Sequence, residues 1–428
     1  MVIFFNLNWG WLMDKKDFND GLIGFLDASP TPFHAVKNMC GMLKNAGFEE
    51  LDESCDFNLL KGGKYFVTRN DSSLIAFNYG MGRDYTIVAT HTDSPNLKLK
   101  PNPLIKEHGV VKFGVESYGG MLLNSWFDRD LSLAGRVSYV DSSNQLQDAI
   151  IDIKKPIAVI PSLAIHLDDK ANKDKTINKQ TDICPIVSCD KDFEFDTFLK
   201  EYLKKNGYDA DKIYAHELSL YDTQKASCLG MDDEFITASR IDNLLSCYVA
   251  LLNICSVCES KPVMLVATDH EEVGSVSMAG ADSGFLQDIL KRVFVEKEEY
   301  YKTLSSSFLI SCDNAHAIHP NFASKHDGNH TPFVNGGVVV KTNANQRYTS
   351  NSKTVARFKK VADEVGESVQ DFVSRSDMGC GSTIGPAISS KLGIKSIDIG
   401  VPTWAMHSIR EVCGVDDAYS LYKILVNI

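Results

Sequence analysis

Residues 85–95, YTIVATHTDSP, form an apolar run that ends in polar residues and is closed by a proline. A buried strand of a parallel sheet has this pattern and delivers its functional side chains at its carboxyl end. After residue 231, apolar runs alternate with helical patterns, which favours an α/β fold with a mostly parallel, mixed sheet flanked by helices. We expect strands at residues 262–268, 308–311, 338–341 and 395–399, and helices at residues 241–258, 283–293, 352–365, 385–391 and 416–426.

The start of the chain belongs to the same α/β pattern. Two helices are expected between residues 14 and 47, because apolar residues recur at helical spacing and a glycine supplies a stop. Short strands follow at residues 65–68, 74–78 and 85–89.

Residues 96–231 have a different sequence pattern. The strand-like segments VVKFGVES, LAGRVSYV, AIIDI and PIAVIP alternate with turn-rich connections, and DDKANKDKTINKQTD is typical of an exposed, mobile loop. The 428 residues also exceed what one ordinary core holds. The sequence therefore predicts a β-rich domain at residues 96–231, inserted into a catalytic domain formed by residues 1–95 and 232–428.

Composition excludes several classes of partner. The net charge of -12 argues against nucleic-acid binding, and no run approaches the roughly 18 apolar residues of a membrane span.

Eleven scattered cysteines indicate reduced thiols in the cytoplasm. The pair Cys255 and Cys258 is expected to pack in a helix rather than bind metal. The opening MVIFFNLNWGWLMDKK lacks the features of a signal peptide; it is either an extension or precedes a natural start at Met13.

Side chains that can bind metal follow strands or begin helices at five places. Imidazole and carboxylate groups together suit zinc and similar divalent ions. Each place alone has an ordinary alternative, such as a surface triplet, an acidic turn, a helix-start aspartate or a packed histidine. The prediction rests on all five occurring in order: His91 with Asp93, Asp242, Glu271 with Glu272, Asp313, and His407.

Two of these groups, the pair His91 and Asp93 and the pair Glu271 and Glu272, have a specific chemical logic. A metal-bound imidazole needs its second ring nitrogen held by an acceptor, and Asp93 is placed to do this for His91. Adjacent carboxylates such as Glu271 and Glu272 repel each other when buried, unless cations neutralise them. One glutamate can then bind metal while the other accepts a proton from water.

Six segments resemble the motifs of the M18 family, the aspartyl aminopeptidases, and they recur in family order through nearly the whole chain. They are THTDSPNLKLKP, SRIDNL, DHEEVGS, SCDNAHAIHPN, NQRYTSN and AMHSIREVCG. The resemblance implies a zinc-peptidase-like catalytic domain that binds two divalent metal ions, zinc first, with cobalt or manganese as alternatives.

The same resemblance assigns roles to the metal-binding side chains. Asp242 is expected to bridge the two metals, with His91 and Asp313 on one side. Glu272 and His407 are expected on the other. Asp93 would orient His91, and Glu271 would be the general base.

The resemblance further implies substrate contacts at His166, His316, Lys341 and Tyr348. The ordinary alternatives are a solvated lysine and a half-buried tyrosine ring. A lysine cation near the metals would explain a preference for acidic residues, by a charge-assisted hydrogen bond. In the family, a histidine such as His166 acts in the active site of a neighbouring subunit, which implies a homo-oligomer, a dodecamer built from dimers.

Together with this resemblance, the sequence predicts a cytoplasmic aminopeptidase that removes the N-terminal residue of peptides and prefers aspartate or glutamate. Two alternatives remain open. One is a related two-metal carboxypeptidase or deacylase, since fold and metals do not determine the substrate. The other is a catalytically silent shell or cargo-binding protein built on a peptidase fold.

Overall fold

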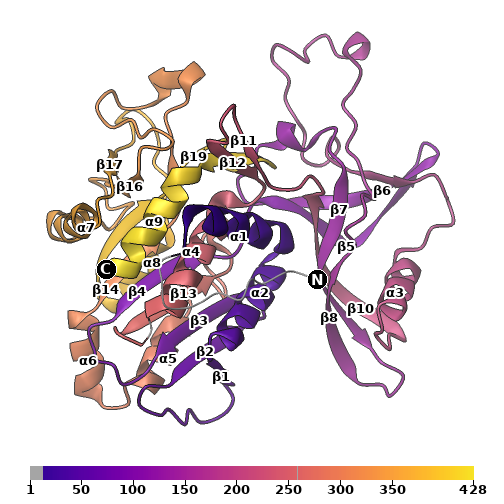
Figure 1. Ribbon diagram of the computed structural model, residues 1–428. Coiled ribbons are helices and arrows are strands. Elements are labelled where there is room, and N and C mark those ends of the chain that lie inside the picture. Colours follow the sequence, from indigo (N-terminus) through magenta and orange to yellow (C-terminus); the bar gives the residue numbers. More distant parts are fainter. Residues whose placement is uncertain (1–12, 258) are drawn as a thin grey trace. The chain divides into compact units, whose positions relative to one another are not determined.

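The computed structural model describes residues 13–257 and 259–428, so the expectations for the opening residues and for Cys258 lie outside the described part. The chain divides into two compact units (Figure 1). The first contains residues up to Ser94, Ala226–Met406 and Glu411–Ile428. The second contains Pro95–Lys225 and His407–Arg410. The chain therefore returns to the first unit at residue 226, and a short segment near its end belongs to the second.

The first unit is built on a mixed sheet of nine strands among the described residues. In order of pairing they are β1 (Glu49–Glu50), β2 (Lys64–Arg69), β3 (Ser73–Asn78), β13 (Val263–Thr268), β4 (Thr86–His91), β14 (Phe308–Cys312), β18 (Lys395–Gly400), β16 (Val338–Lys341) and β17 (Val369–Phe372). The central strands β13, β4, β14 and β18 are parallel neighbours, whereas β3 and β16 pair antiparallel at either side of them. The predicted α/β architecture is confirmed.

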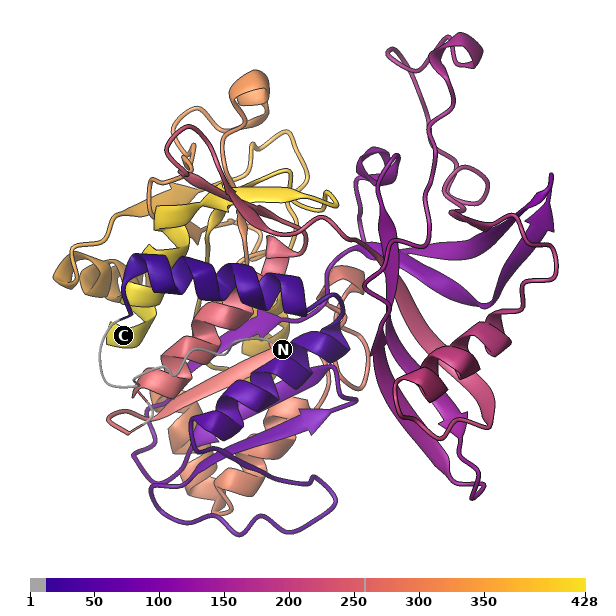
Figure 2. The ribbon, with the colours of Figure 1, turned by 45° about the vertical axis from the view of Figure 1, so that its right-hand side comes forward.

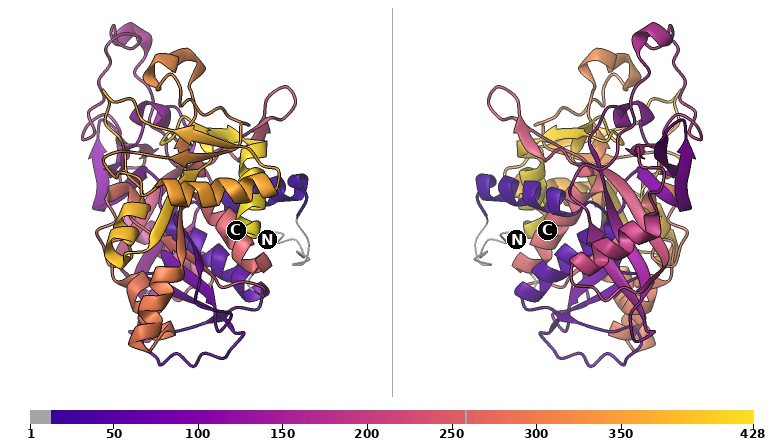
Figure 3. Two further views of the ribbon diagram at one scale, coloured as in Figure 1. Left: turned by 90° about the vertical axis from the view of Figure 1, so that its left-hand side faces the viewer. Right: turned by 90° about the vertical axis from the view of Figure 1, so that its right-hand side faces the viewer.

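Helices cover both faces of this sheet (Figures 2 and 3). One face packs against α1 (Lys15–Ala28), α2 (Pro32–Asn45), α4 (Ile241–Val257), α7 (Ser352–Glu364) and α9 (Val415–Asn427). The other packs against α5 (Phe285–Val293), α6 (Lys297–Ser306) and α8 (Ile384–Leu392). Side chains alternate between the two cores, so that Val88 of β4 joins the first and its neighbours Ile87 and Ala89 join the second. Burial on both faces explains why these strands read as continuous apolar runs.

A smaller sheet completes the first unit. It consists of β11 (Ser227–Leu229), β12 (Phe235–Ala238), β20 (Glu411–Gly414), β19 (Pro402–Trp404) and β15 (Ala315–His316). Its strands are too short to give a clear pattern, and the sequence did not predict it.

The second unit contains a six-stranded antiparallel sheet. In order of pairing its strands are β8 (Leu146–Asp152), β7 (Leu131–Val140), β10 (Lys212–Asp222), β5 (Asn96–Glu107), β6 (Val110–Tyr118) and β9 (Ile186–Ser188). Helix α3 (Phe195–Lys205) buries Phe195, Leu199 and Leu203 in the core of this unit. Residues 168–182 form turns and are mostly exposed, as predicted for a loop.

One predicted strand of the second unit is wrong. The segment PIAVIP, residues 156–161, forms only two isolated bridges, Leu131 with Ala158 and Val159 with Ile186. Its two prolines lack the N–H groups that a strand contributes to a sheet.

Two further properties concern the whole described part of the chain. None of its helices combines the length and the apolar character that crossing a bilayer requires. Its cysteines are all free thiols.

Candidate metal centre

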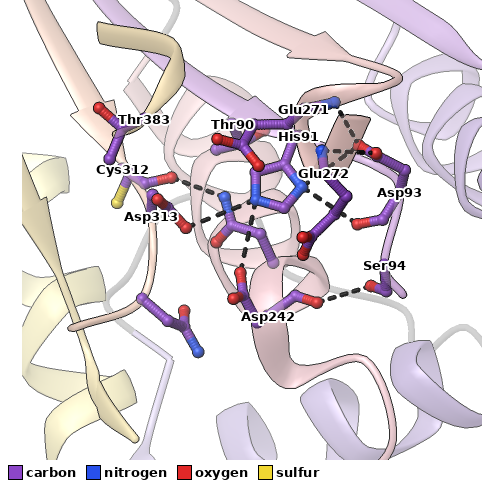
Figure 4. A network of polar contacts seen from close by, with 12 residues as sticks. Thr90, His91, Asp93, Ser94, Asp242, Glu271, Glu272, Cys312, Asp313 and Thr383 are labelled. Atoms are coloured by element: carbon purple, nitrogen blue, oxygen red, sulfur yellow. Dashed lines mark hydrogen bonds and ion pairs between the residues drawn. The ribbon is translucent and has the colours of Figure 1, made fainter. Parts of the chain in front are cut away.

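Four segments bring acidic side chains and one imidazole together in the first unit (Figure 4). His91 is the last residue of β4, Asp313 follows β14, and Glu271 and Glu272 follow β13 in a 3-10 turn. Asp242 lies at the start of α4. Since β13, β4 and β14 are parallel neighbours, their carboxyl ends meet at one edge of the sheet.

His91 is oriented by Asp93 from one side and faces two carboxylates on the other. Its Nδ1 lies 3.0 Å from the Asp93 carbonyl oxygen and 3.3 Å from Asp93 Oδ1. Both are acceptors, so the proton belongs on Nδ1. Nε2 lies 3.4 Å from Oδ1 of both Asp242 and Asp313, where its lone pair would be available to a cation bound among them. This is the tautomer that a metal-binding histidine requires.

The carboxylate of Asp93 also holds the two glutamates. Its Oδ1 accepts the backbone N–H of Glu271 and its Oδ2 that of Glu272, each at 3.1 Å. Asp93 is 1% exposed, so water does not compete for these bonds. One side chain therefore supports three of the predicted functional residues, where the sequence suggested only one.

The negative charge of the carboxylates in this cluster favours the binding of cations. One ligand atom each from His91, Asp242 and Asp313 lie within 4.8 Å of one another, and so do those of His91, Glu271 and Glu272. Burial raises the pKa of Glu271 to about 8, with added repulsion from nearby carboxylates and an opposing effect of His91. Burial disfavours the imidazolium of His91, but its carboxylate neighbours outweigh this and raise its pKa well above the usual value. Divalent ions would neutralise the carboxylates, and the imidazole and oxygen donors fit zinc.

Two side chains that the sequence did not indicate hold the backbone of Asp242. Glu411, buried on β20, accepts the N–H of Asp242 at 2.9 Å. Ser94 Oγ donates to the carbonyl oxygen of Asp242 at 2.6 Å. The backbone at Asp242 and Asn243 is non-helical, and the peptide bond between them is cis. No local signal indicated Glu411, because its short strand was not predicted and its partner Asp242 lies 169 residues away.

Lys341, which was predicted as a substrate contact at a strand end, is buried and bonded to a proposed metal ligand. It is 2% exposed, and its Nζ donates to Asp313 Oδ2 at 3.3 Å and to the Asn314 carbonyl at 3.1 Å. Its Nζ also lies 5.3 Å from the centre of the Tyr348 ring. The lysine cation therefore already interacts with Asp313.

A cavity of about 330 Å³ lies in the first unit beside Tyr348. His316 and Tyr348, two of the predicted substrate contacts, both line it. Further lining residues include His319, Lys325, His326, Asp327, Phe372, Arg375, Met378 and Trp404. Burial raises the pKa of Tyr348, so its phenol is neutral and can donate a hydrogen bond. The wall is thus partly aromatic and carries more basic than acidic groups.

The two remaining predicted residues belong to the second unit. His407 donates from Nδ1 to the Gly120 carbonyl oxygen at 2.9 Å, which directs Nε2 away from that bond. His166 lies in an exposed 3-10 turn, Ile165–Leu167. Their assignment as metal ligand and substrate contact stays a prediction.

Comparison with known proteins identifies close relatives. The family model described as Aminopeptidase I zinc metalloprotease (M18) matches residues 25–427. The "Probable M18 family aminopeptidase 2" of Pseudomonas aeruginosa (strain UCBPP-PA14) is 48% identical over 419 residues, covering 96% of this chain and 97% of the relative. A chain in the cryo-EM structure of the Ape4 and Nbr1 complex superposes with a TM-score of 0.91 at 38% identity, covering 96% of this chain and 86% of that chain. The S. cerevesiae mApe1 dodecamer has a TM-score of 0.84 at 26% identity, covering 96% of both chains.

Proposed function

The chain belongs to the M18 family of aminopeptidases, and we propose that it removes the N-terminal residue of peptides, with a preference for aspartate and glutamate, with the help of two divalent metal ions. The observation that carries this proposal is the cluster of His91, Asp242 and Asp313 beside Glu271 and Glu272.

We assign the first metal to His91, Asp242 and Asp313, and the second to Asp242, Glu272 and His407. The donor set supports this division for the first unit, and the family resemblance supports it for His407. When bound, zinc ions act as Lewis acids that polarise a scissile carbonyl and lower the pKa of a water molecule. The clustered carboxylates of Asp242, Asp313, Glu271 and Glu272 favour the binding of two cations rather than one.

Glu271 is the general base in this proposal. Its carboxylate accepts a proton from the attacking water and returns it to the amine nitrogen of the departing peptide. Asp93 keeps Glu271 in place through the backbone N–H, and it keeps the Nδ1 proton on His91. The bound cations would lower the raised pKa of Glu271, since opposite charge favours the carboxylate.

The acidic preference rests on the basic character of the region around the cavity. Lys341 supplies a buried cation next to Asp313, and Lys325 and the histidines line the cavity, together with Arg375, which is paired with Asp377. A substrate carboxylate gains a charge-assisted hydrogen bond there, whereas a leucine side chain does not.

Hydrolysis of Asp-, Glu-, Leu- and Lys-p-nitroanilide, with N-acetyl-Asp-p-nitroanilide as the blocked control, tests this function. The proposal predicts cleavage of the free Asp and Glu substrates ahead of Leu and Lys, and none of the blocked one. Cleavage of the blocked substrate would instead favour a deacylase or carboxypeptidase. Inactivity on every substrate, with zinc bound, would favour the silent shell.

We further propose that the chain is a cytoplasmic homo-oligomer, a dodecamer built from dimers. The dodecamer of the related mApe1 supports this, as do the free thiols of the described cysteines. The apolar side chains Leu163, Ile165 and Leu167 are exposed around His166, which suits a segment that is covered by a neighbouring subunit.

Sedimentation of the protein at decreasing concentration, with activity measured on the same samples, tests the role of assembly. If His166 acts in a neighbouring subunit, activity per chain falls as the oligomer dissociates. A monomer with full turnover would contradict that role.

A further inference from the structure

Asp398 is a fully buried carboxylate outside the metal cluster. It lies on β18 with 0% exposure. Its Oδ2 accepts the backbone N–H of Thr349 at 2.6 Å and the Thr349 hydroxyl at 2.8 Å, and its Oδ1 accepts the Thr383 hydroxyl at 2.5 Å. A carboxylate this deeply buried costs free energy unless its oxygens are bonded, and here these three donors serve them.

These bonds join two segments that are distant in sequence. Thr349 belongs to the loop before α7, and Thr383 is the N-cap of α8, where its hydroxyl also accepts the N–H of Gly385 at 3.3 Å. A Cβ at Gly385 would lie 2.5 Å from Asp398 Oδ1, so only glycine lets α8 approach the carboxylate this closely. The close approach of α8 to β18 therefore depends on Gly385 on the helix and on Asp398 on the strand.

Neighbouring residues strengthen the same junction. Ser350 Oγ accepts the N–H of Asp398 at 3.0 Å, and Ser382 Oγ donates to the Arg347 carbonyl oxygen at 3.2 Å. Tyr348 lies between the tied residues Arg347 and Thr349, so its backbone is held on both sides.

The two segments that Asp398 joins, which contain Thr349 and Thr383, form part of the wall of the cavity described above. Tyr348 lines it from one segment, and Gly379 and Gly381 line it from the segment that leads to Thr383. The Lys341 cation lies 5.3 Å from the Tyr348 ring and 3.3 Å from Asp313, so the Tyr348 position also affects the surroundings of a proposed metal ligand.

We propose that Asp398 is a positioning residue for substrate binding: its buried carboxylate fixes Tyr348 against the loop before α8 and so sets the shape of the cavity. The proposal rests on the proposed function insofar as the cavity receives the N-terminal residue of the substrate. It assigns Asp398 no contact with the substrate and no proton transfer.

A second buried carboxylate, that of Asp417, serves as a control that distinguishes a positioning role from an effect on protein stability alone. Asp417 is also 0% exposed, and its two oxygens accept the N–H groups of Asn335 and Gly337 at 2.5 and 2.7 Å. The segment that Asp417 holds contributes no residue to the cavity wall. Removing either carboxylate deprives buried donors of a partner, but only Asp398 holds Tyr348.

The test compares Asp398→Ala, Asp398→Asn and the matched control Asp417→Ala in the zinc-loaded protein. Loss of a charged acceptor is expected to raise KM for Asp-p-nitroanilide about tenfold in Asp398→Ala, with kcat and bound zinc changed less than about twofold. Asp398→Asn should recover most of this, because its amide can accept from Thr349 and donate to Thr383. Asp417→Ala should leave KM unchanged. Equal KM values for Asp398→Ala and Asp417→Ala would overturn the proposal.

Hydrogen exchange supplies a readout that does not need activity. The Thr349 N–H should exchange faster in Asp398→Ala, in peptides covering residues 343–351, while peptides from α6 and the central strands keep their rates. A uniform increase along the chain would instead mean general destabilisation and would contradict a positioning role. If the wild-type protein cleaves no free Asp substrate, the proposed function fails, and the exchange result still decides whether Asp398 holds the loop.

A milder pair of variants covers the case in which Asp398→Ala does not fold. Thr349→Val removes one donor to Asp398, and Thr303→Val alters a more deeply buried threonine on α6 whose hydroxyl has no hydrogen-bond partner among the described residues. Thr349→Val should raise KM about three- to tenfold, and Thr303→Val should leave it unchanged. No difference between them would contradict the proposal.

Discussion

The carboxylate of Asp93 accepts the backbone N–H of Glu271 at 3.1 Å, across 178 residues of sequence. Its second oxygen accepts from Glu272, and its first also lies 3.3 Å from Nδ1 of His91. The proposed base and two proposed metal ligands thus share one buried support. Their relative positions depend on the ionised form of Asp93, because only a carboxylate can accept from both N–H groups at once.

Asp93→Asn should weaken metal binding and slow catalysis together. Both backbone donors are N–H groups that cannot reverse, so the amide NH₂ of asparagine must face one of them. We expect zinc affinity to fall about 10- to 100-fold, as for other residues that orient metal ligands, with a lower kcat at saturating zinc. Zinc titration and steady-state kinetics measure both. Asp417→Asn, which also sets an amide against two N–H donors, is the matched control and should lose stability but no zinc affinity.

Glu271→Gln should separate chemistry from metal binding. Glutamine has the same shape but cannot accept the proton from the attacking water, so kcat is expected to fall by about 10² to 10⁴. Zinc content by elemental analysis should remain near that of the wild type, because Glu271 is not a proposed ligand. Glu364→Gln, at an exposed ion pair on α7, controls for the change of charge. Retained activity in Glu271→Gln would remove Glu271 from the mechanism.

Lys341→Leu tests the source of the acidic preference. If the Lys341 cation recognises a substrate carboxylate, the ratio of kcat/KM for Asp- and Leu-p-nitroanilide should fall about ten- to a hundredfold. Lys360→Leu, at a side chain that is 76% exposed, is the control. A normal ratio with reduced zinc content would show that Lys341 serves Asp313 rather than the substrate.

The stability of the second unit should depend on pH through His216. This histidine packs against Phe195, with ring centres 5.4 Å apart, and lies next to the backbone of Pro101. Burial lowers the pKa of His216 below its usual value of 6.5. Below pH 6.5 the unfolded chain therefore takes up a proton that the folded chain resists, so stability falls on acidification and returns above this pH.

His216→Phe should reduce this acid sensitivity. Thermal unfolding at pH 5.5 and 7.5 measures it: the variant should lose less in Tm between the two pH values than the wild type does. An equal loss of Tm in both proteins would contradict the assignment.

The main features of the fold could be predicted because the central strands are buried on both faces and read as apolar runs. The same reasoning located His91 and Asp313 at strand ends, since parallel strands end at one edge of the sheet. Helix α3 was missed although Phe195, Leu199 and Leu203 recur at helical spacing, because the apolar strands around it dominate that part of the sequence. PIAVIP was misread for the converse reason: its residues are apolar, but the prolines at its two ends lack the N–H groups that a strand contributes to a sheet.

What the sequence could not indicate are contacts made by tertiary structure. The bonds from Glu271 to Asp93 and from Asp242 to Glu411 join residues that are far apart in sequence, and no local pattern records them. Burial of Lys341 beside Asp313 was also not predictable, because a lysine at a strand end is usually solvated.

The most direct test of the account is metal reconstitution of wild-type protein and Asp242→Asn, with bound zinc and Asp-p-nitroanilide hydrolysis measured on the same samples. Asp242 is the proposed ligand shared by both ions. Chelation should abolish hydrolysis, two zinc ions per chain should restore it in the wild type, and Asp242→Asn should bind less zinc and stay inactive. Hydrolysis by the metal-free protein, or full recovery of Asp242→Asn, would contradict it.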